Sequence, residues 1–228
     1  MLILPALAYI IIFNYLTIYG VQIAFRDFKA VEGITGSAWV GLTHFTTFFQ
    51  TFYSSRLIIN TFLLNLYGLF FGFPVPIILA ILINSLNRQK FKKFTQTVVY
   101  VPHFISTVVM AGMIYIFLSP TSGIFNKVIT GLGGDAIFFL NLEEWFRPIF
   151  IISGIWQNAG WSSILYIAAL AGVDQELYEA ATIDGATKFQ KVIHIDIAHL
   201  IPIVTLMLIL SCGNLLSSST EKALLPKR

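Results

Sequence analysis

Uncharged polar side chains interrupt two long apolar stretches of this sequence, at Asn60, Asn65, Gln157 and Asn158. An amide both donates and accepts hydrogen bonds, and in an apolar environment it must find a partner or water. Such groups either hold neighbouring helices together or line a passage for a polar solute. Trp156 and Trp161 lie beside the amide pair and offer flat aromatic faces. The residues alone leave both interpretations open.

No catalytic centre is predicted from the motifs. The sequence contains no HExxH, GxSxG or GxxxxGKS/T pattern, and Gly131-Leu-Gly-Gly-Asp135 is a weak glycine-rich match. The single cysteine, Cys212, lies within an apolar run, so neither a disulfide nor a thiolate metal site is expected. We therefore expect no catalytic residue, no metal and no cofactor. Without a P-loop, any energy from ATP has to come from a partner chain.

The composition indicates a membrane protein. Of the 228 residues 57% are hydrophobic and 11% are charged, whereas a soluble domain carries roughly 25% charged residues. Five charge-free runs each exceed the roughly 20 residues that a helix needs to cross a bilayer. They predict an all-α membrane protein whose membrane domain covers residues 1–220, followed by an atypical tail at 221–228. The five transmembrane helices are expected at about 2–25, 60–86, 96–119, 148–172 and 198–218.

Charge sets the expected orientation. Residues 88–93 carry four cations and no anion, and such a cluster is typical of the cytoplasmic side of a membrane. Alternation of the spans then places 174–196 on the same side and places 26–56 and 127–147 outside. The other basic residues form no surface stripe, so membrane lipid is the expected contact and nucleic acid is not.

Residues 174–196 are predicted to form two short helices separated by a break. Asp174 is a favourable N-cap for the first helix, and its apolar residues recur at helical spacing: Leu177, Ala180 and Ala181. Gly185 permits the turn that ends this helix, and Asp184 is expected to cap the helix that follows. The small alanine side chains would allow another surface to approach closely. The segment is therefore interpreted as a docking loop.

The stretch Glu179-Ala-Ala-Thr-Ile-Asp-Gly-Ala186, followed by Pro202, resembles the EAA loop of type I ABC importer permeases. Residues 101–109 and 153–161 resemble the complex-carbohydrate branch of that family, which includes oligosaccharide and aldouronate-type permeases, and the similarity covers about 1–217. The resemblance implies the type I ABC permease fold, with coupling helices that sit in a groove of an ATPase subunit. The residues that it assigns to this contact are Glu179, Ala180, Ala181, Asp184, Gly185 and Ala186.

The resemblance also implies a function and a set of partners. The chain would be a multi-pass permease subunit that moves oligosaccharides or related carbohydrates across a bacterial cytoplasmic membrane. Its partners would be a second permease subunit, a cytoplasmic ABC ATPase dimer and an extracellular or periplasmic solute-binding protein. In that setting, the passage interpretation assigns sugar hydrogen bonding and stacking to Trp156, Gln157, Asn158, Trp161, Asn60 and Asn65.

Two features depart from the family pattern. The stretch Ile195-Asp-Ile-Ala198 lacks the proline that usually follows a hydrophobic residue there, which is expected to shift where the fifth span begins. The family usually has six spans, so a chain truncated before the sixth is expected. The alternatives are a membrane scaffold or sensor that uses the same loop without transport, or an inactive truncated permease.

Overall fold

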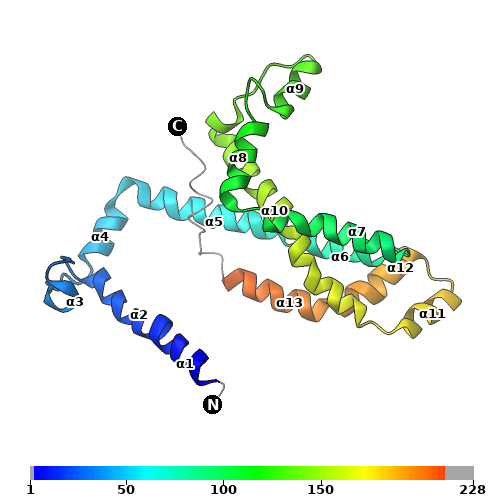
Figure 1. The fold of residues 1–228 in the computed structure, drawn as a ribbon, viewed down its shortest axis with the longest axis horizontal. Helices are drawn as coiled ribbons and strands as arrows, with labels where there is room; N and C mark the ends of the chain where they lie inside the picture. The colour runs from blue at the N-terminus through cyan, green and yellow to red at the C-terminus, as the bar shows by residue number, and fades with distance from the viewer. Residues whose placement is uncertain (1–2, 214–228) are drawn as a thin grey trace. The chain divides into compact units, whose positions relative to one another are not determined.

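The computed structural model describes residues 3–213, and every regular element in that range is a helix (Figure 1). Three helical stretches are long and apolar enough to cross a membrane: Leu4–Phe25, Phe52–Asn84 and Lys188–Gly213. A fourth crossing results if the bent pair Gln89–Phe104 and Thr107–Phe117 forms one span. The prediction of an all-α membrane protein is confirmed.

The chain divides into a first unit, residues 1–60, and a second unit, residues 61–228, with the boundary inside α5 (Phe52–Gly72). The first unit begins with one helical stretch built from α1 (Leu4–Ile10), η1 (Ile11–Tyr15), α2 (Leu16–Ile18) and η2 (Tyr19–Phe25). Two short helices follow, α3 (Gly33–Gly36) and α4 (Thr43–Gln50).

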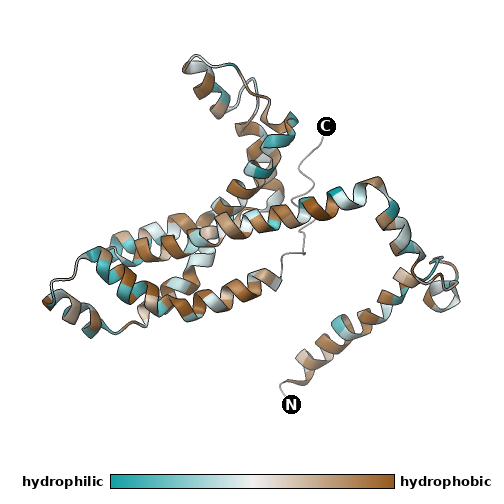
Figure 2. Cartoon of the chain, turned by 180° about the vertical axis from the view of Figure 1, so that it is seen from behind, coloured by the Kyte–Doolittle hydropathy of each residue, from teal (hydrophilic) through white to brown (hydrophobic). Residues whose placement is uncertain are grey.

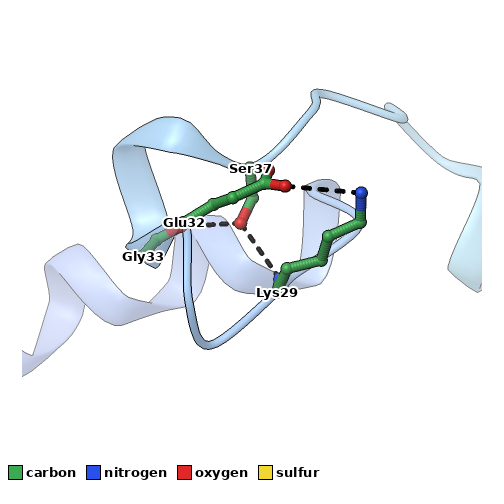
Figure 3. A network of polar contacts seen from close by, with 4 residues as sticks. All are labelled: Lys29, Glu32, Gly33 and Ser37. Atoms are coloured by element: carbon green, nitrogen blue, oxygen red, sulfur yellow. Dashed lines mark hydrogen bonds and ion pairs between the residues drawn. The ribbon is translucent and has the colours of Figure 1, made fainter.

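The segment after η2 is held by local polar and aromatic contacts. The Arg26 guanidinium donates to the carbonyl oxygens of Thr35 and Ser37, at 3.2 and 2.9 Å. It also lies over the Trp39 ring, 5.5 Å from its centroid. Figure 3 shows the buried Ser37 hydroxyl, which donates to the Gly33 carbonyl and accepts from the Lys29 amide. The segment after η2 is thus an ordered substructure, and its place outside the membrane stays a prediction.

The second unit is built around α10 (Glu143–Ala171). This helix packs against α6 (Pro74–Asn84), α7 (Gln89–Tyr100), η3 (Val101–Phe104) and α13 (Ala198–Gly213). Its core brings together buried residues of α6, α10 and α13 and the loop after α10: Ala80, Tyr166, Leu170, Val173 and Leu200. In Figure 2 these long helices are mainly hydrophobic, and hydrophilic residues gather where α7 begins.

Between α8 (Thr107–Phe117) and α10 the chain forms a compact loop with α9 (Ile124–Gly131) and η4 (Phe139–Asn141). The buried Asn126 side chain closes this loop. Its Nδ2 donates to the Ile137 carbonyl at 3.0 Å, and its Oδ1 accepts from the Ile137 amide at 2.7 Å. These paired bonds hold the two halves of the loop together.

The helix bounds differ from the predicted spans in informative ways. The predicted span 96–119 is bent by 97° at residues 105–106, directly after η3, which contains Pro102. The predicted span 148–172 lies in α10, which is long enough to cross but less apolar because of polar residues such as Gln157 and Asn158. Its role as a span stays a prediction. The end of the last predicted span, 214–218, and the tail lie outside the described residues.

A glycine permits a close contact between α7 and α10. A Cβ atom added at Gly160 would lie 1.8 Å from the Val99 carbonyl oxygen, far inside the van der Waals distance. The two helices can therefore keep their present separation only with glycine at this position. The pair Gly68 and Gly72 on α5 makes no comparably close helix contact.

We expect Gly160→Ala to destabilise the protein by about 3 kcal/mol, because the α7 backbone has to move away from α10. Thermal unfolding of the detergent-purified chain measures this effect. Gly112→Ala on α8 is the matched control, since an added Cβ there meets no atom within 4 Å. Equal stability of the two variants would contradict the packing described for Gly160.

Candidate functional site

The predicted docking loop begins with α11 (Gln175–Ile183). The Asp174 side chain accepts a hydrogen bond from the Glu176 amide at 3.0 Å, which confirms Asp174 as the N-cap. At the other end, the Ala186 amide donates to the Ala181 carbonyl at 2.9 Å and the Gly185 amide to the Thr182 carbonyl at 3.1 Å. This pair of bonds is the Schellman motif, which places a left-handed residue after the helix. Gly185 takes that conformation, with φ of 75°.

The second helix of the loop, α12 (Lys188–Lys191), is capped by Thr187 and not by Asp184, so that part of the prediction was wrong. The Thr187 hydroxyl accepts from the Gln190 amide, and Gln190 Oε1 accepts from the Thr187 amide at 2.8 Å. This is a capping box, whose sequence signal is Thr followed by Gln three residues later. Asp184 is instead the C-cap of α11.

The helix that starts with α12 continues without a break through the π-helix η5 (Val192–Ile197) into α13. Ala198 occupies the position where a proline was expected, and it permits this continuity because it keeps its backbone N–H. The last apolar helix therefore begins at Lys188 rather than near residue 198. Whether the membrane-crossing part of this helix starts at a different residue than in the family stays a prediction.

The face of the loop that was predicted to dock is largely exposed. Four of its six predicted contact residues are exposed, namely Glu179, Ala180, Asp184 and Gly185, and Ala181 and Ala186 are partly buried. Large apolar side chains lie exposed on the same loop, with Ile183 at 87% and Phe189 at 72% of their full accessibility. Exposed apolar groups on this loop are suited to contact with another surface, and the docking role of the loop stays a prediction.

Tyr178 joins the loop to the helices of the bundle. Its hydroxyl donates a hydrogen bond to the carboxylate of Asp196, which is buried in η5 at 4% exposure. It is also hydrogen-bonded to the side chain of Asn84 at the end of α6. Burial, and then the nearby Asp196 carboxylate, raise the pKa of Tyr178 well above its ordinary value, so the phenol stays protonated.

The same contacts place the basic cluster beside the loop. Lys92 Nζ donates to Asn84 Oδ1 at 3.0 Å, so α7, α6 and α11 meet at one end of the second unit. Alternation of the spans requires this arrangement. Sequence reasoning did not identify Tyr178, although Asp196, an acidic residue at the start of an apolar run, was a signal that a buried partner was needed.

A second group of predicted residues meets where α10 passes η3. His103 Nδ1 lies 3.1 Å from Asn158 Oδ1. The His103 ring stacks on Trp161, with ring centroids 4.6 Å apart and planes 5° from parallel. Phe104 meets the same indole edge-on. The sequence predicted Asn158 and Trp161 as neighbours of a passage and did not predict their contact with His103.

Gln157 has a different environment. It is buried, and its Nε2 donates to the Ile105 carbonyl oxygen at 2.7 Å, across the gap between α10 and the turn after η3. This bond favours the interpretation of Gln157 as a link between elements. Trp156 is about half exposed and does not line either of the two grooves between α5 and α10.

Two grooves run between α5 and α10 in the second unit. The larger, of about 800 Å³, is lined by Asn65, Trp161 and Ser162, with Met207 and Ser211 of α13. The smaller, of about 200 Å³, includes Asn65 and Asn158. Gly68 and Gly72 line both, and because they carry no side chain they leave this face of α5 open. The grooves bring together three of the predicted pathway residues, Asn65, Asn158 and Trp161.

The remaining predicted residue, Asn60, belongs to the first unit and lines neither groove. The lining residues named for both grooves are uncharged. Among residues 3–213, no three His, Cys, Asp or Glu side chains lie close enough together to hold a metal ion. The chemistry available in the grooves is therefore hydrogen bonding by amides and hydroxyls, and stacking on an indole.

Comparison with known proteins identifies the family. Residues 72–221 match the family described as "Binding-protein-dependent transport system inner membrane component". The polygalacturonan/rhamnogalacturonan transport system permease protein YteP of Bacillus subtilis is 42% identical over 221 residues, which are 97% of this chain and 69% of that protein. Protein LplB of the same organism is 40% identical over 225 residues, or 99% of this chain and 71% of LplB.

A solved structure shares the fold. It is the crystal structure of a bacterial ABC transporter involved in the import of the acidic polysaccharide alginate, with a TM-score of 0.90 and 39% sequence identity. The match covers 100% of this chain and 76% of that one. The family match covers more than half of the sequence, and its relatives are aligned over most of their length. The chain therefore belongs to the family of binding-protein-dependent transport system inner membrane components.

Proposed function

We propose that this chain is a permease subunit of a bacterial ABC importer that carries oligosaccharides across the cytoplasmic membrane. The observation that carries the proposal is the solvent-open docking face on α11, held by Tyr178 to the helices that border the grooves. A face of this kind suits a partner that moves the bundle from outside it. The family match and the transport functions of the similar proteins support the same interpretation.

The proposed partners follow from the lack of a nucleotide-binding motif in the sequence and from the exposed loop. The sequence contains no P-loop, so ATP hydrolysis belongs to a separate ATPase dimer that binds the two coupling loops of a permease pair. A second permease subunit supplies the other loop and the other side of the passage. A solute-binding protein delivers the substrate from outside, which agrees with the solved complex of a bacterial alginate ABC transporter with an alginate pentasaccharide-bound periplasmic protein.

The proposed substrate class rests on the chemistry of the grooves. Uncharged amides, a serine hydroxyl and the Trp161 indole are suited to the hydroxyl groups and apolar faces of sugar rings. The similar proteins are named for polygalacturonan/rhamnogalacturonan and for alginate. Oligosaccharides of uronic acids are therefore the first substrates to test, with arabino-oligosaccharides as neutral comparison compounds because a further relative carries that name.

In the proposed mechanism, binding of ATP closes the ATPase dimer and draws the two coupling loops together. α11 then moves with the elements to which Tyr178 joins it, namely η5 and the end of α6. Because η5 continues into α13, the motion reaches Met207 and Ser211 in the larger groove. The larger groove thereby changes the side of the membrane to which it opens.

A photo-crosslinking residue at Ile183 should capture the ATPase subunit in native membranes, because this side chain lies exposed on the docking face. Leu132, which follows α9, is the matched control, since it is also apolar and is 85% exposed. Mass spectrometry of the captured chain should find P-loop peptides. Capture of the ATPase from Leu132 and not from Ile183 would contradict the proposed docking face.

Gly185→Val should reduce the amount of substrate transported per ATP hydrolysed by about fivefold or more, because a β-branched residue resists the left-handed conformation that ends α11. An added Cβ meets no atom within 4 Å, so the effect is conformational and not steric. Gly185→Asn is the control, since asparagine tolerates this conformation. Transport and ATP hydrolysis are measured together in proteoliposomes, and normal coupling in the valine variant would count against the mechanism.

Trp161→Leu should raise the KM for uptake by about tenfold, because the variant loses the stacking face in the larger groove. Gln157→Leu should leave this KM unchanged and instead destabilise the protein by about 1–3 kcal/mol, because the buried Ile105 carbonyl loses its donor. Uptake is measured with whichever uronic acid oligosaccharide the wild-type importer accepts. An unchanged KM in Trp161→Leu would remove Trp161 from the pathway.

A further inference from the structure

Four polar side chains form a directed chain of hydrogen bonds between the basic cluster and the buried Asp196. Lys92 Nζ donates to Asn84 Oδ1 at 3.0 Å. Asn84 is hydrogen-bonded in turn to the Tyr178 hydroxyl, and that hydroxyl donates to the Asp196 carboxylate. Because the Asn84 oxygen accepts from Lys92, its amide nitrogen is the group that donates to Tyr178. Every bond in the chain therefore runs from the cation towards the anion.

This arrangement joins two opposite charges through two neutral groups. Asp196 is buried and its charge needs compensation, while Lys92 is only partly buried and keeps access to solvent. Hydrogen bonds arranged head to tail between a donor cation and an acceptor anion polarise and strengthen one another. The chain crosses four elements, since its members come from α7, α6, α11 and η5.

Tyr178 is the member that belongs to the docking loop. α11 is a helix of nine residues, connected to α10 by a short link and to α12 by the turn at Gly185. Lys191 Nζ, 2.6 Å from Thr182 Oγ1, joins α12 to α11 but does not reach α6 or α7. The contacts of Tyr178 therefore give α11 a direct connection to α6 and, through Asn84, to α7.

We propose that Lys92, Asn84, Tyr178 and Asp196 form a coupling strut that transmits movement of α11 to both α6 and η5 during transport. These are positioning residues, since none of them faces the grooves and the exposed face of α11 is left free for the ATPase. The inference rests on the proposed function and goes beyond it by naming how the docking loop acts on the bundle. Without the strut, α11 can follow the ATPase while α6 stays behind.

The experiment uses the complete importer with its partner subunits, in a Cys212→Ser background that removes the native thiol. Ser162→Cys places a reporter thiol in both grooves, and its labelling rate with a membrane-impermeant maleimide is measured with and without a non-hydrolysable ATP analogue. Co-purification of the ATPase measures docking independently. Neither measurement depends on which sugar the importer transports.

We expect Tyr178→Phe to retain the ATPase but to reduce the ATP-dependent change in labelling about tenfold, because it removes the hydroxyl that receives from Asn84 and donates to Asp196. Tyr115→Phe on α8 is the matched control and should respond as the parent does. Lys92→Met tests the other end of the strut with a side chain of similar length. Its effect combined with Tyr178→Phe should be smaller than the sum of the two single effects.

The outcomes separate the two proposals. If Tyr178→Phe retains the ATPase and its labelling still responds as the parent does, the strut is overturned and the proposed function stands. If Tyr178→Phe folds poorly, Lys92→Met decides, and a parent-like response in that variant overturns the strut. If the parent itself binds no ATPase, the proposed function fails, and the strut fails with it.

Discussion

The buried carboxylate of Asp196 is the constraint on which the arrangement of the loop depends. A charge removed from water is costly unless it is hydrogen-bonded, and here the donor comes from Tyr178 on a different helix. That requirement determines which side of α11 faces the bundle. The opposite side, with Glu179, Ala180 and the exposed Ile183, must then face outward. The direction in which the proposed docking face points is thus a consequence of satisfying one buried group.

The apolar surroundings of a membrane explain a second pattern in the fold. Large hydrophobic side chains on the long helices are exposed, and the buried positions include polar ones such as Gln157, Ser163 and Asn126. In lipid, close packing and hydrogen bonds between elements hold helices together, since burial of apolar surface drives little association there. The α7–α10 contact at Gly160 and the Gln157 bond to Ile105 are examples of these two interactions.

The sequence predicted the elements more completely than their contacts. Long apolar runs and the N-cap at Asp174 depend on neighbouring residues, and both could be read directly. The Thr187 capping box was equally local, but Asp184, three residues earlier, offered a competing cap. Pro102 could indicate that the helix is interrupted there. The angle of the bend could not be predicted, because it depends on how η3 packs against α10.

Contacts between residues far apart in the chain could not be predicted from a single sequence. Tyr178 meets Asp196 across 18 positions, and His103 meets Asn158 across 55. Nothing in the spacing of these residues indicates that they meet. For the same reason, Gln157 and Asn158 looked equivalent as neighbours in sequence, although successive residues of a helix point in different directions. One of them bonds the turn after η3, and the other borders a groove.

The unbroken helix from Lys188 to Gly213 works geometrically as a lever. Its 26 residues make a rod about 39 Å long at 1.5 Å per residue, so a tilt of about 5° at one end displaces the other by about 3 Å. Met207 and Ser211 lie near the far end of this rod, on the wall of the larger groove. A tilt of this size at the Lys188 end therefore moves the wall of the larger groove by about the diameter of a water molecule.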